Sequence, residues 1–144
     1  MQKIDFKNLP DTSTPYTAEN FNQLQTNVEN AINEVVESGS NDNGTWIKWA
    51  DGTMECTKTV EGTIPTTTSW GSLYEGGVPC GNYAQPFIEK PRTNATGQKG
   101  LGNLIQCFGS NQNASSWGTL YILNPTSTSS CSYSIDLVAK GRWK

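Results

Sequence analysis

The sequence predicts a mainly β protein: an antiparallel β-sandwich head of jelly-roll-like form, preceded by one N-terminal helix that forms a trimeric coiled coil. Three observations lead to this fold class. Helical periodicity is confined to residues 17–38. From residue 45 onward, short alternating runs are separated by Gly, Pro, Asn and Asp. Apolar residues make up 34% of the chain and charged residues 16%, and the abundant Gly, Ser, Thr and Asn suit turns and polar sheet faces.

The 144 residues have room for about one ordinary domain with a short extension. We expect an arm and coiled-coil helix over residues 1–40, because two prolines break any regular element before the helix. A polar linker is expected over residues 41–44, and the β-sandwich head over residues 45–144. The chain is thus predicted to be a helix joined by a hinge to a β head.

The helix has recognisable start and stop residues. Thr17 can cap it, Tyr16 and Phe21 stand at the positions of a hydrophobic staple, and Gly39 is a natural stop. Its apolar residues follow the three–four spacing of a coiled-coil seam. We expect the subunit interface at Phe21, Leu24, Val28, Ala31, Ile32 and Val35.

Two interpretations of this apolar stripe are possible. The helix could pack on its own domain, or it could join copies of itself. The polar stretch SGSNDNG after the helix favours the second, because a flexible linker would not press the helix onto a core. Ile32 widens the apolar face, which fits three strands better than two.

The first hairpin is expected where TWIKWA and TMECTKTV flank Asp51-Gly52. This dipeptide predicts a type I′ turn, in which both residues have positive φ angles. Trp46 and Trp49 are an odd number of residues apart, so they lie on opposite faces of their strand. They cannot form one platform for a sugar ring.

The rest of the head is predicted to alternate between strands and loops. A loop-rich middle over residues 61–86 contains short strands at best, near residues 67–68 and 73–74. The last strand alternates most clearly, with Tyr133, Ile135, Leu137 and Ala139 on one face. The other expected elements are a strand in FIEKPRT, a turn in NATGQKGLG, a strand in NLIQCFG, a loop in SNQNASS and a strand in WGTLYILN.

Composition and charge argue against several classes of function. The chain has no histidine, which removes the commonest general base and metal ligand, and its acids are scattered through the β region. We therefore expect no enzyme, no metal site and no cofactor. Residues 1–42 have a net charge of −5 and the remainder +2, which does not suggest a nucleic-acid-binding surface. No apolar run is long enough for membrane insertion, and we expect no secretory signal at the N-terminus.

The four cysteines are Cys56, Cys80, Cys107 and Cys131. Their wide spacing lacks the C-x-x-C pattern of zinc sites. Free buried thiols are the expectation for a protein that stays in a reducing compartment, whereas maturation outside a cell would allow disulfides in any of three pairings.

Aromatic rings and amides on the predicted loops suggest a saccharide site. An aromatic ring stacks on the apolar face of a sugar, while neighbouring amides bind its hydroxyl groups. At least half of these rings would instead belong to the core or a subunit interface. The candidate receptor-binding residues are Trp70, Tyr74, Tyr83, Asn111, Gln112, Asn113 and Trp117.

Three stretches of this sequence resemble tail-fibre and receptor-binding proteins of tailed phages. They are KIDFKNLPDTSTPYTAENFNQLQTNVENAI, GSNDNGTWIKWADGTMECT and the terminal LVAKGRWK, which together span about residues 3–57 and 133–144. The resemblance implies a homotrimer in the virion tail, attached to other phage tail proteins, whose β-sandwich heads bind a bacterial surface receptor such as a cell-wall or capsular saccharide. Residues 58–130 contain no motif of this family, so the resemblance does not identify the receptor.

Two other functions remain open. The protein could be a structural tip or adaptor of the virion that binds no receptor. It could also be a depolymerase that cleaves a polysaccharide, although such an enzyme needs two acids facing each other across a cleft, and the sequence does not pair any.

Overall fold

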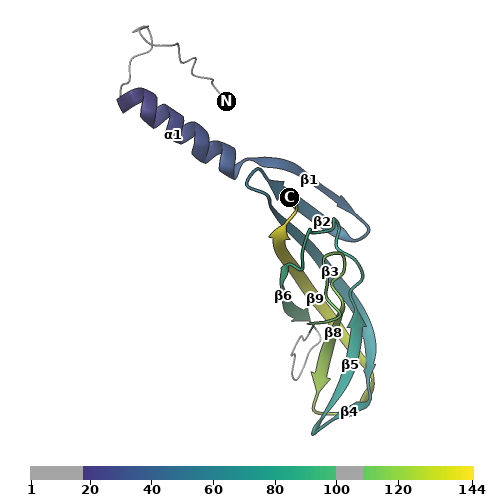
Figure 1. The fold of residues 1–144 in the computed structure, drawn as a ribbon. Helices are drawn as coiled ribbons and strands as arrows, with labels where there is room; N and C mark the ends of the chain where they lie inside the picture. Colours follow the sequence, from purple (N-terminus) through teal and green to yellow (C-terminus); the bar gives the residue numbers. More distant parts are fainter. Residues whose placement is uncertain (1–17, 100–108) are drawn as a thin grey trace, which may run out of the picture.

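The computed structural model describes residues 18–99 and 109–144. These residues form one helix followed by nine strands, which make up the head. Figure 1 shows the helix extending away from the strands at one end of the elongated molecule. The elements are α1 (Ala18–Asn33), β1 (Val35–Asn41), β2 (Gly44–Trp49), β3 (Thr53–Thr66), β4 (Thr68–Trp70), β5 (Leu73–Pro79), β6 (Arg92–Lys99), β7 (Gly109–Ser110), β8 (Thr119–Asn124) and β9 (Thr128–Arg142).

The strands form two sheets. One has the order β1-β2-β3-β9-β6 and the other β4-β5-β8-β7, and every strand pairing within the described residues is antiparallel. The mainly β, antiparallel architecture with one helix is therefore confirmed, and two sheets around a shared core are consistent with a β-sandwich. The jelly-roll-like form and the trimeric coiled coil stay predictions.

The two longest strands, β3 and β9, form the spine of the head. They pair from Thr53↔Arg142 at the helix-proximal end to Thr66↔Thr128 at the far end (Figure 1). The alternation predicted for the last strand is confirmed: Ile135, Leu137 and Ala139 are buried, while the residues between them face outward. The buried residues of β9 lie between Ser134 and Ala139, where the strand supplies one wall of the core.

The core lies between the sheets and beneath the segment from Cys80 to Pro91. This segment is tied down by backbone hydrogen bonds, in which Phe87 N–H donates to Ala114 O and Ile88 N–H to Arg142 O. The buried apolar cluster contains Met54, Cys56, Val78, Cys80, Tyr83, Ala84, Phe87, Trp117, Leu120, Ile122, Ile135, Leu137 and Ala139. Among the residues whose burial is described, none from α1 belongs to this cluster.

The predicted helix boundary and the predicted linker are both wrong. The helix ends at Asn33, and the next residues form β1, which pairs with β2 from Val35↔Trp49 to Asn41↔Gly44. Residues 41–44 are therefore the turn of a hairpin, and the head's sheet begins at Val35. The adjacent β-branched Val35 and Val36 favour a strand, and β2 satisfies the backbone of the polar stretch that follows.

The turn between β2 and β3 also differs from the prediction. Ala50, Asp51 and Gly52 connect the strands, and only Gly52, with φ +89°, has a positive φ. The Asp51 carboxylate accepts hydrogen bonds from the backbone N–H (2.7 Å) and hydroxyl (2.9 Å) of Thr53. A two-residue type I′ turn is therefore wrong: glycine supplies the unusual backbone angle and the aspartate side chain closes the turn.

The predicted order of strand and turn is wrong between residues 87 and 99. No strand covers Phe87 to Pro91, and β6 begins directly after Pro91 and runs through the residues expected to form a turn. Pairing with β9 stabilises this segment despite its low strand propensity, from Arg92↔Lys140 to Lys99↔Ser134. The strand expected in NLIQCFG lies outside the described residues, except for Gly109, which begins β7.

Candidate functional site

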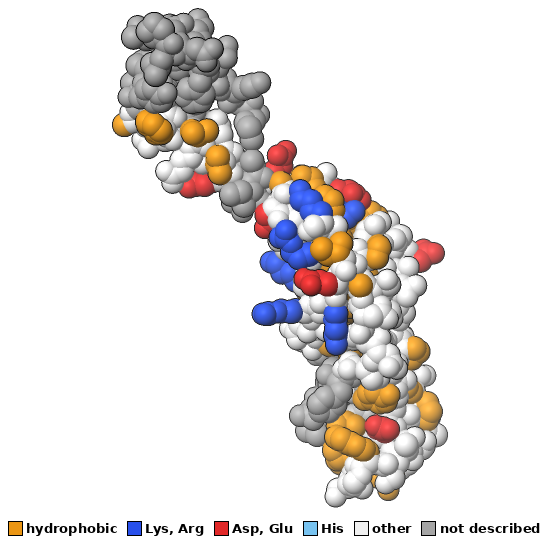
Figure 2. Space-filling view, viewed as in Figure 1, with side chains coloured by type: hydrophobic (Ala, Val, Ile, Leu, Met, Phe, Trp, Pro, Cys, Tyr) orange, Lys and Arg blue, Asp and Glu red, His pale blue; other side chains and the backbone are white. Residues whose placement is uncertain are grey.

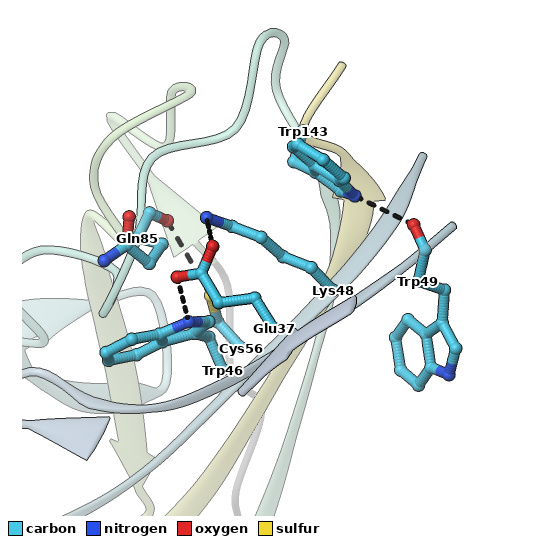
Figure 3. Close-up of polar contacts among 7 residues, drawn as sticks. All are labelled: Glu37, Trp46, Lys48, Trp49, Cys56, Gln85 and Trp143. Atoms are coloured by element: carbon cyan, nitrogen blue, oxygen red, sulfur yellow. Dashed lines mark hydrogen bonds and ion pairs between the residues drawn. The ribbon is translucent and has the colours of Figure 1, made fainter. Parts of the chain in front are cut away.

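The tryptophan-rich first hairpin is held together by its own polar groups. Glu37 on β1 accepts hydrogen bonds from Trp46 Nε1 at 3.0 Å and from Lys48 Nζ at 2.9 Å (Figure 3). Lys48 and then Trp46 lower the pKa of the Glu37 carboxyl through these bonds. A carboxylate paired in this way holds two strands in register and is not poised as an acid or base.

Trp49 and Lys48 of the same hairpin contact Trp143 near the C-terminus. Trp143 Nε1 donates to the carbonyl oxygen of Trp49 at 3.1 Å, and Lys48 Nζ lies 5.4 Å from the centre of the Trp143 ring. Figure 3 shows the Trp46 and Trp49 rings on opposite sides of their strand. Their predicted separation is confirmed, so the hairpin provides no tryptophan platform.

Acids of the head take part in structural hydrogen bonds. Glu61 accepts from the hydroxyl of Ser134 at 2.8 Å, and Asp136 accepts from the hydroxyl of Thr59 at 2.7 Å. In residues 18–99 and 109–144, no three His, Cys, Asp or Glu side chains are grouped so that they could hold a metal ion. No helix in this part of the chain is long and apolar enough to cross a membrane.

Three of the four cysteines are described, and no disulfide joins any two of these three. Cys56 and Cys80 are buried in the core, and Cys131 is partly exposed on β9. Burial raises the pKa of the Cys56 thiol, which favours its protonated form. Cys107 lies outside the described residues.

Two of the predicted receptor-binding rings belong to the core. Tyr83 and Trp117 are only 3% and 1% exposed, and their ring centroids are 4.6 Å apart. Tyr83 also packs edge-on against Phe87 at 5.0 Å. Neither ring is exposed at the surface, so the expectation of surface rings on these loops is wrong for both, and their role in binding stays a prediction. They lie next to loop sequence, and no local pattern reveals that these loops close over the core.

Trp70 and Tyr74 lie together on the β4–β5 hairpin at the end of the head farthest from α1 (Figure 1). Trp70 is 51% exposed and Tyr74 is partly exposed. Gly71, with φ +62°, makes the tight turn between the two strands. The hairpin therefore presents one large ring at the distal end of the molecule.

The three predicted amides lie in the connection between β7 and β8. Asn111 is exposed with φ +59°, and the Asn113 side chain accepts hydrogen bonds from the backbone N–H groups of Ser115 and Ser116. Gln112 reaches across to the other sheet, where its Nε2 donates to Thr93 Oγ1 at 2.9 Å. The predicted residues therefore do not form one site.

A cavity of about 240 Å³, here called the edge pocket, lies where β6 and β7 border the two sheets. It includes two of the predicted residues, Gln112 and Trp117. Sequence reasoning missed the others, because pairing between distant strands brings them together. The lining residues are Thr93, Asn94, Ala95, Gly109, Gln112, Trp117, Leu120 and Leu137.

A second, more open hollow of about 410 Å³ lies along β2, β3 and β9. Hydroxyl groups are already paired along it: Thr45 and Thr57 share a hydrogen bond of 2.6 Å, and Thr59 donates to Asp136. It is a shallow part of the sheet face, and the edge pocket is the more enclosed candidate for a small ligand.

Charge is unevenly distributed over the head. Figure 2 shows the Lys, Arg, Asp and Glu side chains gathered toward α1, with little charge toward the distal end. In the sequence, residues 62–79 contain one charged side chain, Glu75, and residues 109–135 contain none. The distal half therefore presents neutral polar groups and a few aromatic rings.

Comparisons with known proteins give little information about identity. No family model matches the chain, and no curated protein matches it. Among solved structures, an N-truncated R1-type pyocin tail fiber is similar at 12% identity with a TM-score of 0.49, covering 87% of this chain and 96% of that one. A similarity of this size assigns neither a family nor a function.

Proposed function

We propose that this protein is a homotrimeric tail-fibre or receptor-binding protein of a phage virion that adsorbs to a saccharide on the bacterial surface. The observation that supports it most is the helix. α1 projects from the head (Figure 1). Its seam residues Leu24 and Val28 are 42% and 49% exposed. A single helix of 16 residues is marginal in water, so a partner for its apolar stripe is expected.

Copies of the same chain are the partner that fits this stripe. The spacing of Phe21, Leu24 and Val28 is that of a and d positions in a coiled coil, and the opposite face is polar. Because α1 ends at Asn33, the stripe excludes Val35, and the coil is shorter than the sequence predicted. The heads must therefore contribute to holding the trimer together.

The distal half of the head suits a neutral saccharide. It is almost uncharged and presents the half-exposed Trp70, a ring of the kind that stacks on sugars. In a trimer, three such ends bind one surface together, so the overall affinity for the surface rises although the affinity of each single site is unchanged. The protein acts by binding alone, at the host surface, while the helix end joins it to other tail proteins.

Light scattering on the purified protein tests the assembly. We expect a mass three times the 15.7 kDa of the chain. A monomer at micromolar concentration would contradict the proposal, because the apolar stripe would then lack the partner on which it depends.

Adsorption tests the receptor function. Labelled protein should bind intact cells of at least one strain in a bacterial panel, and purified wall or capsular polysaccharide should compete. A trimer that binds no strain would instead be a structural tip or adaptor. Release of reducing ends from the polysaccharide would identify a depolymerase.

A further inference from the structure

We propose that the edge pocket binds one neutral sugar residue of a surface saccharide, an inference that rests on the proposed function and identifies a ligand site for it. The pocket combines an apolar floor, an uncharged polar rim and a volume of about 240 Å³. Those three properties define the ligand, and each follows from residues that the fold brings together.

The floor is apolar because it is the end of the sandwich core. Trp117, Leu120 and Leu137 line the pocket, and all three are at least nine-tenths buried. Leu137 comes from β9 and Leu120 from β8, so the floor joins the two sheets. A surface of this kind suits the C–H face of a sugar ring, which is apolar even though its edge is rich in hydroxyls.

The rim provides hydrogen-bonding groups without charge. Gln112, Thr93 and Asn94 line the pocket, and Gln112 Nε2 already donates to Thr93 Oγ1. This bond leaves the Gln112 carbonyl oxygen as an acceptor and the Thr93 hydroxyl hydrogen as a donor. Hydroxyl groups of a sugar can pair with both, because each hydroxyl donates and accepts.

Position and size limit what can enter. Within the described residues, β6 pairs with β9 alone and β7 with β8 alone, so both strands border the sandwich where the pocket opens. The volume is below the roughly 300–1,000 Å³ of pockets for drug-sized ligands, so one ring fits better than an oligosaccharide. None of the described residues that line the pocket is charged, so an acidic sugar would lose hydration there without gaining an oppositely charged partner among them.

A titration followed by NMR tests the pocket in the full chain. Glucose, galactose, rhamnose, N-acetylglucosamine and glucuronic acid are added separately to the labelled protein. At least one neutral sugar should shift the Trp117 indole N–H resonance, with a Kd on the order of millimolar for so small a ligand. Glucuronic acid should not shift it. If no neutral sugar moves the Trp117 resonance, the proposal is wrong.

Paired variants separate the pocket from the rest of the surface. Gln112→Ala and Thr93→Val should each weaken binding about fivefold to tenfold, the effect of one lost hydrogen bond. Gln25→Ala removes an exposed glutamine of α1, whose side chain donates a hydrogen bond to Glu29 in the same helix, and this variant should bind as the wild type does. Unchanged affinity in both pocket variants, with unaltered spectra elsewhere, would overturn the proposal.

The same variants distinguish this proposal from the proposed function. Wild-type protein that adsorbs to cells, together with pocket variants that adsorb equally well, would show that the receptor binds elsewhere and that the pocket proposal is wrong. Wild-type protein that adsorbs to no cells would overturn the proposed function itself.

Discussion

Gly118 and Gly71 share a positive φ, +73° and +62°, but differ in the space beside them. A Cβ at Gly118 would collide with the carbonyl oxygen of Ser110, whereas one at Gly71 would meet no atom within 4 Å. Gly71→Ala should lower the free energy of unfolding by about 1 kcal/mol, the cost of a left-handed backbone for an L residue. Gly118→Ala should lower it by about 3 kcal/mol, because the backbone must also move.

Urea unfolding of the two variants beside the wild type measures this difference. If both variants lose the same free energy of unfolding, the backbone of the β7–β8 connection must shift at little cost around Gly118. That result would contradict the prediction. Since Gln112 is in that connection, the Gly118 variant should also disturb the edge pocket, whereas the Gly71 variant should not.

The Tyr83 hydroxyl is buried and finds no hydrogen-bond partner among the described residues. Tyr83→Phe keeps the ring contacts with Phe87 and Trp117 and removes the unsatisfied group, so stability should rise by about 1 kcal/mol. Burial, with a smaller contribution from Cys56, raises the pKa of Tyr83 to about 12. Because its pKa in the unfolded chain is about 10, ionisation of Tyr83 does not affect the free energy of unfolding below about pH 10. That free energy falls as the pH rises from about 10 toward 12, because the unfolded chain gives up the proton more readily than the folded one.

Urea midpoints of wild type and Tyr83→Phe at about pH 7 and about pH 11 check both statements. The variant should be more stable at neutral pH, and the difference should widen at high pH because only the wild type has a buried hydroxyl that must ionise. A variant less stable than the wild type would indicate a partner for the hydroxyl. Cell adsorption should not change, because the ring is not at the surface.

At the scale of elements, substitutions in the apolar stripe of α1 test whether this helix assembles the trimer. Leu24→Asn combined with Val28→Asn should convert the trimer to a monomer, because both side chains lie on the proposed seam. Gln23→Asn with Thr26→Asn places the same two residues on the polar face and should leave the trimer intact. Light scattering distinguishes the outcomes, and a trimer that survives the first pair would show that the heads alone assemble.

Strands with a clear alternation of buried and exposed residues were predictable. β9 is the clearest case, since Ile135, Leu137 and Ala139 all face the core as expected. The strand and turn in SGSNDNG were not predictable, because small polar side chains of this kind are typical of a flexible linker. This stretch forms strand and turn through backbone hydrogen bonds to β2, and no local pattern shows that β2 offers them.

The candidate site was less predictable than the fold, for a related reason. Gln112 was expected at a ligand site and does line the edge pocket, but Thr93 comes from a strand that was expected to end near it. Tyr83 and Trp117 were expected on the surface and are buried. Exposure of a loop aromatic depends on how distant loops close over the core, which single-sequence patterns do not encode.

At the scale of the whole molecule, the helix and the distal hairpin lie at opposite ends of an elongated chain (Figure 1). The core cluster is built from residues of the head, and none of the α1 residues whose burial is described belongs to it. A coiled coil at one end would hold three heads side by side with their charge-poor ends pointing the same way. Assembly and ligand binding should therefore be separable.

A chain that begins at Glu34 tests this separation. It should still unfold cooperatively, because it retains both sheets and the whole core, but it should be a monomer. Its affinity for a soluble monosaccharide should equal that of the full chain, since the edge pocket is unchanged. Its apparent affinity for intact cells should fall by about 10²–10⁴, because three linked sites raise the effective concentration at the surface and one site does not. If the truncated chain adsorbs to cells as strongly as the full chain, a single head accounts for the whole affinity. The trimer would then serve attachment to the tail and not avidity.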